Sequence, residues 1–192
     1  MLVEEISLAP GLLVAMPQLH DPHFTRAVVL MIEHNEQGSF GLLINQPSPI
    51  RASELLQSLE MAWAGDDHAV VWSGGPVSPS TGWVLHEPVT ELDALEVGGG
   101  TTTIAPGLAL STSPERLRSL AARPPGRIRL LLGYSGWGAG QLASEMAAGS
   151  WLHTSIDPAL IFDLEPDEMW AAAVRSLGIS NPDAVVQSHG IH

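Results

Sequence analysis

The chain has 192 residues, 45% of them hydrophobic, and eight arginines without a lysine stand against 21 acidic residues, for a formal charge of −13. The absence of lysine excludes a P-loop and Schiff-base catalysis, and the absence of cysteine excludes disulfides, thiolate zinc sites and cysteine nucleophiles. A net charge of that sign opposes long-range attraction to nucleic acid and anionic lipid.

The length favours one domain, because a chain of this size buries roughly 70% of its surface on folding. We expect a single domain over residues 1–192, with its core at about 11–178 and a loose tail at 181–192. The first residues lack the basic and long apolar regions of a signal peptide, and no apolar run approaches the roughly 18 residues of a membrane span. A cytoplasmic protein without membrane contact is therefore expected.

The first part of the chain predicts three strands, over apolar runs at Gly11–Pro17, Ala27–His34 and Phe40–Pro47. Turn residues separate the second run from the third, which predicts an antiparallel hairpin buried on both faces. Ser53 is expected to cap a short helix whose leucines recur at helical spacing.

The middle of the chain predicts five further strands, at Ala69–Ser73, Gly82–His86, Thr101–Ala105, Leu108–Ser113 and Arg127–Tyr134. A glycine turn at 98–100 leads into the third of them, and the third and fourth are expected to form a second hairpin. Ser113 followed by Pro114 predicts the start of a helix that ends before Pro124.

The last part predicts a glycine-rich turn over 133–140, a helix over about 139–148, and short strands at 151–154 and 160–164. Pro166 is expected to open a final helix that Gly178 ends. Strands outnumber helices and neighbouring strands form hairpins, which predicts a mixed α/β or α+β class rather than a doubly wound sheet.

The glycine-rich turn has two interpretations. Backbone N–H groups at a turn that opens a helix bind anions, and Gly138 to Ala143 match the G-x-G-x-x-A variant of the dinucleotide fingerprint. However, several residues separate the motif from the preceding strand, and the chain lacks repeated βαβ units. We therefore favour a structural turn whose glycines let Trp137 pack closely.

Ser135 also lies in this segment and could act as a nucleophile. It does not form a nucleophile elbow, because Trp137 stands where that motif needs glycine. A serine hydrolase that uses His34 or His86 with an acid remains an alternative to a loop hydroxyl bonded to the backbone.

Histidines and carboxylates occur together in three places that could bind zinc or iron. His20 and His23 flank Asp21, and Glu33-His34 and His86-Glu87 lie at strand ends. None of them fits a known ligand pattern such as HExxH, so we expect no metal and a hydrogen-bonded role for His34.

A run without acidic residues after Glu115 holds five of the eight arginines: Arg116, Arg118, Arg123, Arg127 and Arg129. Alternation of Arg127 and Arg129 with apolar residues is typical of a strand with one solvated face, and Arg116 and Arg118 are expected on the outside of an amphipathic helix. Docking of an acidic partner or of nucleic acid is the alternative.

Several long motifs follow one another in the chain: AMPQLHDPHF, IEHNEQGSFGLLINQP, SGGPV, GWVLH, LGYSGWGAGQL with Glu145, and WL. Together they resemble the YqgE/AlgH family over about Leu12 to Gly178. Gln46 and Ala143 stand where that family commonly has a basic and an acidic residue, and His20 lies where it varies. These differences argue against a charged site at the first two positions and against metal binding through His20.

The resemblance implies a bifurcated, largely antiparallel sheet that forms a pseudo-barrel flanked by helices. It also implies a transcriptional regulator, although the chain has no familiar DNA-reading motif and its charge opposes direct DNA binding. The candidate ligand-binding residues stand at strand ends and turns, where sites are usually built. We expect several of them to meet in one surface cleft; they are Asp21, Glu33, His34, Asn45, His86, Tyr134, Ser135, Trp137, Gln141 and Glu145, with Gly74 and Gly75 as turn-makers.

The expected function is a non-enzymatic regulatory module that binds a small ligand or a protein partner and needs no cofactor. Two alternatives stay open. One is a hydrolase or metal-assisted enzyme that works through His34, Glu33 or Ser135, and the other is nucleic-acid binding through the Arg116–Arg129 stretch. The oligomeric state is not defined by the sequence.

Overall fold

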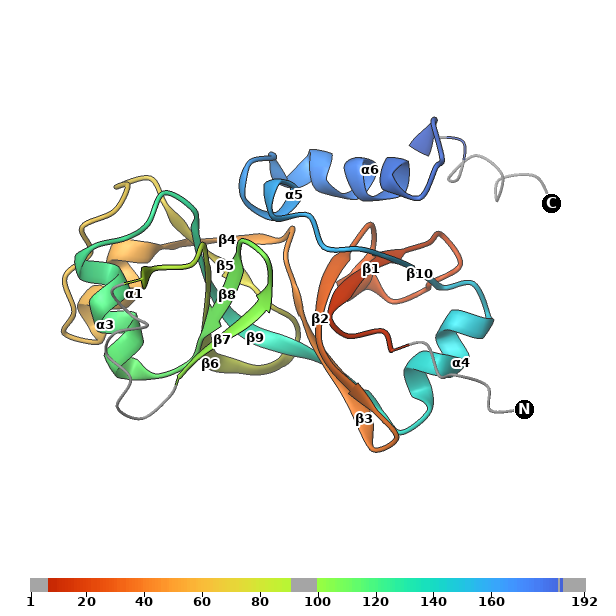
Figure 1. Cartoon of the computed structure of the whole chain (residues 1–192), viewed down its shortest axis with the longest axis horizontal. Coiled ribbons are helices and arrows are strands. Elements are labelled where there is room, and N and C mark those ends of the chain that lie inside the picture. Colours follow the sequence, from red (N-terminus) through yellow and green to blue (C-terminus); the bar gives the residue numbers. More distant parts are fainter. Residues whose placement is uncertain (1–6, 91–99, 183, 185–192) are drawn as a thin grey trace.

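The computed structural model describes residues 7–90, 100–182 and 184, which form a curled ten-stranded sheet flanked by helices (Figure 1). The strand order is β10-β1-β2-β3-β9-β6-β8-β7, and β5 joins β4 to β9. Among the described strands, every pair is antiparallel except β5 with β9. The predicted mixed α/β fold with a bifurcated, largely antiparallel sheet is confirmed.

The described strands are β1 (Gly11–Ala15), β2 (Val28–Asn35), β3 (Gly38–Leu43), β4 (Pro47–Arg51), β5 (Val70–Ser73), β6 (Val77–His86), β7 (Thr101–Ala105), β8 (Leu108–Ser111), β9 (Ile128–Gly138) and β10 (Trp151–Thr154). The described helices are η1 (Pro22–Phe24), α1 (Ala52–Ser58), α3 (Pro114–Ala122), α4 (Gln141–Ala147), α5 (Pro158–Phe162) and α6 (Pro166–Ser176).

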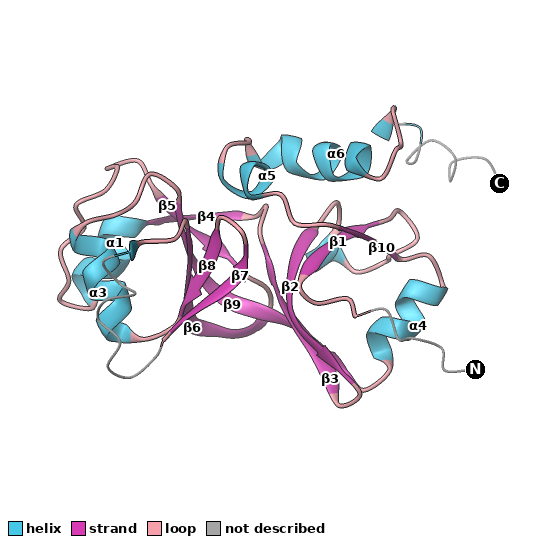
Figure 2. Ribbon diagram, in the orientation of Figure 1, coloured by secondary structure: helices cyan, strands magenta, loops and turns pink. Residues whose placement is uncertain are grey.

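Strand β9 runs through two lobes of the molecule (Figure 2). Its first half pairs with β5 and β6, and its second half pairs with β3. We call the part built from β1, β2, β3, β10 and α4 the first lobe, and the part built from β4 to β8 with α1 and α3 the second lobe. Because β9 pairs with strands of both lobes, neither lobe is complete without it.

The largest apolar cluster extends across both lobes. It contains Leu12 and Leu30 from the first lobe, Leu85 and Leu131 from the second, and Trp170 from α6. The indole Nε1 of Trp170 donates a hydrogen bond of 2.8 Å to the Ala15 carbonyl, which ties α6 to the end of β1. Two smaller clusters lie under α4 and under α1 with α3.

Both predicted hairpins and most helix boundaries are confirmed. β2 pairs with β3 and β7 with β8, in each case antiparallel. The Ser113 hydroxyl accepts a hydrogen bond of 3.2 Å from the Arg116 amide at the start of α3, and Gly178 follows α6 with φ of 87°. The first half of β2 is buried on both faces as predicted, whereas its second half alternates between half-buried and exposed positions.

The expected glycine-rich turn over 133–140 is wrong. β9 continues to Gly138, and its glycines lie in register with β3, Gly136 opposite Phe40 and Gly138 opposite Gly38. Hydrogen bonds to a neighbouring strand hold this glycine-rich segment extended, so local turn preference does not decide its structure. The turn is confined to Ala139 and Gly140, and Gly138 to Ala143 therefore lack the geometry of a dinucleotide fingerprint.

Three smaller differences have local causes. Residues 160–164 do not form a strand, because Asp157 caps α5 through the Ala159 amide at 3.0 Å and Pro158 occupies its first turn. Ser53 does not cap α1, which begins one residue earlier, after Arg51, without a side-chain cap. The sequence did not predict β4 because two prolines interrupt it, and prolines are confined to such edge strands.

Three glycines allow close backbone contact where the chain passes between β5 and β6. A Cβ atom at Gly74 would clash with the Gly133 carbonyl, and one at Gly133 would clash with the Gly75 carbonyl. Gly75 and Gly133 also have φ of 142° and 80°, which other residues rarely adopt. The SGGP segment is therefore a crossing point of the backbone beside β9.

No helix in the described part of the chain is long and apolar enough to cross a bilayer. The expected loose tail falls mostly outside the described residues, as do the glycines at 98 and 99 and the residues before Ser7.

Candidate functional site

The expected single cleft is wrong, because most of the candidate residues divide between two ends and two faces of the first lobe, while His86 lies on β6 in the second lobe. Asn45 and Asp21 lie where β2 begins, and the Asn45 Oδ1 accepts a hydrogen bond of 3.0 Å from the Val28 amide. His34 lies six residues along β2, about 20 Å away at roughly 3.3 Å per residue. Gln141 follows β9 near that second end, where its Oε1 accepts a hydrogen bond of 3.0 Å from the Gly138 amide.

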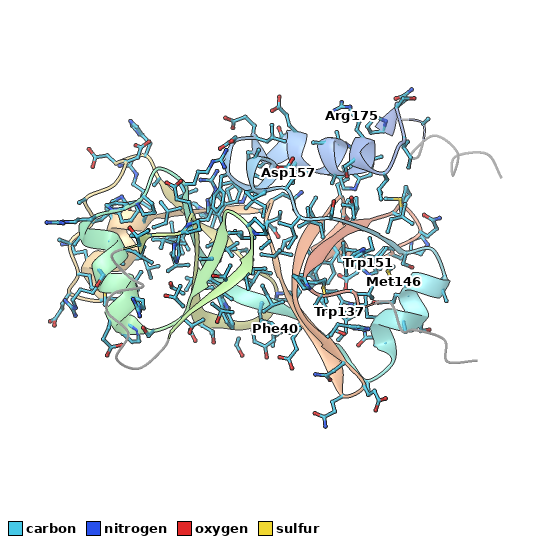
Figure 3. The ribbon with its side chains drawn as sticks, in the orientation of Figure 1. Phe40, Trp137, Met146, Trp151, Asp157 and Arg175 are labelled. Atoms are coloured by element: carbon cyan, nitrogen blue, oxygen red, sulfur yellow. The ribbon has the colours of Figure 1, made fainter. Side chains whose placement is uncertain are left out.

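Register separates the faces at the second end. Phe40 is paired with Glu33 and with Gly136, so these residues share a face, and Tyr134 lies on it two residues before Gly136. Ser39 is paired with His34 and with Trp137, which places both on the opposite face. Figure 3 shows Phe40 and Trp137 on the two sides of β3.

A shallow hollow of about 460 Å³ lies on the Phe40 face, lined by Glu33, Phe40, Val77 and Tyr134 among others. The rings of Phe40 and Tyr134 meet edge to face at 5.8 Å, and Trp83 stands 5.5 Å from Phe40. The Glu33 carboxylate accepts a hydrogen bond of 2.9 Å from the Asn35 side chain. Of the ten predicted residues, Glu33 and Tyr134 thus meet at one open surface, with part of Trp137 at its border.

Hydrogen bonds within the fold engage the polar groups on the other face. The Nδ1 of His34 lies 2.6 Å from the Ser39 hydroxyl, and the Trp137 Nε1 donates a bond of 2.7 Å to the Glu145 carboxylate. Trp137 is also enclosed by the rings of Phe24 and Trp151 at 6.2 and 5.9 Å. Trp137 and Glu145 therefore form a packing contact between β9 and α4.

Ser135 and His86 are both fully buried. The Ser135 hydroxyl donates to the Gly74 carbonyl at 3.2 Å. The two ring nitrogens of His86 lie 2.7 Å from the Glu87 carbonyl and 2.8 Å from the Ser111 hydroxyl. The carbonyl can only accept, so His86 Nδ1 carries the proton and Nε2 accepts from Ser111. Neither side chain reaches a surface that a substrate could contact.

Two members of the arginine stretch, Arg116 and Arg129, do not lie on the expected solvated face. Arg116 is buried within α3. Arg129 lies between the rings of Trp72 and Phe162, 4.9 and 6.0 Å from their centroids, and donates to the Phe162 carbonyl at 2.9 Å. Burial lowers the pKa of the Arg129 guanidinium, opposed by the negative charges of Asp163 and Glu165. Arg127 is more exposed and pairs with Asp163.

The three suspected metal sites contain too few ligands. Asp21 caps the short helix η1, because its Oδ1 accepts a hydrogen bond of 2.9 Å from the His23 amide. The same oxygen lies 3.0 Å from His23 Nδ1. Within residues 7–90, 100–182 and 184, no three metal-ligating side chains gather in one place. Asp21 therefore has a defined structural role.

A pocket that the sequence did not predict lies in the second lobe, between α1, α3 and the sheet. Its volume is about 260 Å³, and its walls are mostly apolar side chains of both helices, the segment after α1 and strands β6 and β9. We call it the α1–α3 pocket; its apolar lining includes Leu55, Leu59, Met61, Val84, Leu117, Leu130 and Leu132. One signal in the sequence could have indicated it, Gly82 within an otherwise apolar strand segment; Leu59, which follows α1 and is exposed, marks it in the structure.

Comparison with known proteins gives a consistent result. The profile of the AlgH-like family matches residues 12–182. A UPF0301 protein of Myxococcus xanthus is 43% identical over 97% of this chain and 99% of its own length. The solution structure of AlgH from Pseudomonas aeruginosa is similar with a TM-score of 0.75 and 36% identity, over 100% of this chain and 99% of that one.

A crystal structure of a Corynebacterium diphtheriae protein is similar with a TM-score of 0.67 and 25% identity, over 87% of this chain and 86% of that one. The resemblance drawn from the motifs is thus confirmed along nearly the whole chain, and the chain belongs to the AlgH-like family.

Proposed function

We propose that this protein is a non-catalytic regulatory module of the cytoplasm that binds a small, mostly apolar ligand in the α1–α3 pocket. The observation that carries the proposal is the pocket itself. It is a hollow of about 260 Å³ with largely apolar walls, close to the lower end of the roughly 300–1,000 Å³ typical of ligand sites.

The floor of the pocket explains why it is hollow. Gly82 of β6 is paired with Leu132 of β9, and a Cβ atom at Gly82 would have only the Leu132 Cδ2, at 3.9 Å, within contact distance. The strand position that faces the two helices thus has no side chain to fill the space. Leu59 remains 45% exposed at the side of this space, although its burial would be favourable.

Hydroxyl groups give the pocket a polar side. Ser80 and Thr112 line it, together with Ser113. The Ser113 hydroxyl is engaged as the cap of α3, whereas Ser80 and Thr112 are exposed. This distribution suits an apolar body that carries one hydroxyl or similar neutral polar group.

Two features support a binding role over the alternative activities. The side chains considered for hydrolysis are engaged within the fold, Ser135 with Gly74 and His34 with Ser39. Arg116 is buried and Arg129 is half-buried over the Trp72 ring, so these two arginines of the stretch offer little to a phosphate backbone. Any effect on transcription would therefore be indirect, through a protein partner that responds to the ligand.

The proposal is tested with 1-octanol as a probe of an apolar body with one hydroxyl. We expect saturable chemical-shift changes in the methyl groups of Leu55, Leu117 and Leu132 when the protein is titrated and followed by NMR. Gly82→Val fills the floor and should weaken binding by at least about tenfold, because each methyl placed in the pocket displaces part of the probe.

The matched control is Gly136→Val, which adds the same side chain to an exposed position of β9 with only ordinary contacts. It should leave the octanol titration unchanged. Non-saturable shifts spread over the whole surface, or equal binding by Gly82→Val and the unsubstituted protein, would show that this hollow is not a ligand site.

A further inference from the structure

A second pocket lies in the first lobe, on the opposite side of the molecule from α1 and α3. It has a volume of about 440 Å³ and forms where the segment after β1 meets α6. We call it the Arg26 pocket; it is lined by Ala15, Met16, Pro17, Leu19, His20, Asp21, Pro22, Thr25, Arg26 and Trp170.

The backbone of Arg26 is held in an unusual conformation. Its φ is 54°, in the left-handed region that costs a residue with a side chain about 1–2 kcal/mol. Asn45 maintains it, because its Nδ2 donates to the Arg26 carbonyl at 2.9 Å while its Oδ1 accepts from the Val28 amide at 3.0 Å. Strain of this kind, held by a specific side chain, is found mainly at functional sites.

The guanidinium of Arg26 lies over an aromatic ring. Its Cζ is 4.9 Å from the centroid of Trp170, whose Nε1 is bonded to the Ala15 carbonyl. The indole is thus fixed, and stacking on it limits the orientations of the guanidinium plane. Arg26 is exposed and, within the described residues, forms no ion pair, so its N–H donors are available to an incoming group.

The neighbouring acid does not compete for this cation. Asp21 is directed to the amide and ring of His23 as the cap of η1. His20 and Thr25 add two further potential donors, and Met16, Leu19 and the two prolines provide apolar walls. The pocket therefore combines one planar cation and the Asp21 carboxylate, which is hydrogen-bonded to His23, with apolar walls, in a chain of formal charge −13.

We propose that the Arg26 pocket binds a small organic monocarboxylate, with the carboxylate in a bidentate contact with the Arg26 guanidinium and the apolar part against Met16 and Leu19. A guanidinium fork matches carboxylate geometry. A monoanion is favoured over a phosphate ester because the pocket supplies one permanent cation and the field of the whole chain repels a dianion more strongly. This site is independent of the α1–α3 pocket.

The test uses sodium benzoate as the probe and the indole N–H signal of Trp170 in NMR spectra as the reporter. We expect a saturable shift of this signal, with the Trp63 indole, bonded to the Asp66 carbonyl in the second lobe, as an internal reference that does not move. Arg26→Asn should weaken binding roughly 10- to 100-fold, as expected for loss of charged hydrogen bonds.

Asparagine is chosen because it accepts the left-handed conformation, so the backbone around η1 is kept while the guanidinium is removed. Arg118→Gln, an exposed arginine of α3, makes the same change of net charge elsewhere and should bind benzoate as the unsubstituted protein does. Phenyl phosphate is the third arm, and it should bind more weakly than benzoate.

Three results would overturn the proposal. One is a Trp170 shift that does not saturate, and another is equal affinity for benzoate in Arg26→Asn and in Arg118→Gln. Tighter binding of phenyl phosphate than of benzoate would assign the pocket to phosphate esters instead.

Discussion

The Trp137 side chain makes both ring contacts and a hydrogen bond through its indole nitrogen. The ring packs against Phe24 and Trp151, and the Nε1 donates to a carboxylate on α4, a contact that joins the last residues of β9 to the helix that follows. The sequence marked both Trp137 and Glu145 as candidates for a binding site. Their spacing of eight residues could not show that the two side chains bond to each other, because it spans the end of a strand, a turn and a helix.

Replacement of Trp137 by Phe should lower the free energy of unfolding by about 1–3 kcal/mol, since a hydrogen bond to a charged group is lost along with ring area. Urea denaturation provides the measurement. Trp63→Phe is the matched control, because it loses an equal side-chain volume and a bond to the neutral Asp66 carbonyl, and it should cost less. Equal costs for the two substitutions would mean that the bond to the Glu145 carboxylate stabilises the protein no more than a bond to a neutral carbonyl does.

The surroundings of Arg129 could not be predicted from the alternation of arginines and apolar residues in its strand. Its alternation with apolar residues predicted a solvated position, which is wrong, because the rings of Trp72 and Phe162 from two distant segments cover its guanidinium. Asn45 and Asp21, in contrast, were singled out as site residues from their motifs, and both lie at the Arg26 pocket or support it. The sequence therefore identified some of the residues of that region but not the residue that they position.

At the scale of elements, the sequence predicted the hairpins and the helices that begin at Pro114 and Pro166, because their signals are local. It was wrong for β9, where six residues from Gly133 to Gly138 resemble a turn and yet are extended. Partner strands from other parts of the chain supply the hydrogen bonds that hold them: β3 pairs with Ser135 to Gly138, and β6 pairs with Tyr134 through Val77. Local sequence patterns do not show which distant segments pair, and this is why the extended conformation of the segment was not predicted.

The backbone crossing beside β9 leads to a prediction for Gly133. Gly133→Ala should destabilise the protein by about 2–4 kcal/mol, because its Cβ would overlap the Gly75 carbonyl and its φ of 80° disfavours a side chain. Gly136→Ala in the same strand meets no such obstacle and should be neutral or stabilising by about 0.5 kcal/mol. Thermal unfolding of the two variants checks this, and a similar melting temperature for both would contradict the assigned role of the crossing.

At the scale of the whole molecule, one strand and one apolar cluster serve both lobes. Leu131 is buried in that cluster together with Leu12 and Leu30 of the other lobe. We therefore expect the lobes to unfold in a single transition, as the sequence-based expectation of one domain also requires.

Leu131→Ala should cost about 2–5 kcal/mol and lower the unfolding midpoint of both lobes together. The indole signals of Trp83 in the second lobe and Trp137 in the first, followed by NMR against urea, report each lobe separately. Coincident midpoints are expected in the unsubstituted protein and in the variant. A shift confined to Trp83 would show that the lobes are independent domains.

During synthesis, β1 and β3 of the first lobe emerge long before β10 and β9, with which they pair. Residue 12 of β1 pairs with residue 154, and residue 41 of β3 pairs with residue 135, so the first lobe cannot be completed until residues more than 90 positions further along have been synthesised. Until β9 and β10 have emerged, the apolar strand Val28–Met31 has only its sequence neighbours β1 and β3 beside it. Because late long-range pairing slows folding, we expect the emerging protein to aggregate more readily, and to depend on chaperones more, than a chain built of local hairpins.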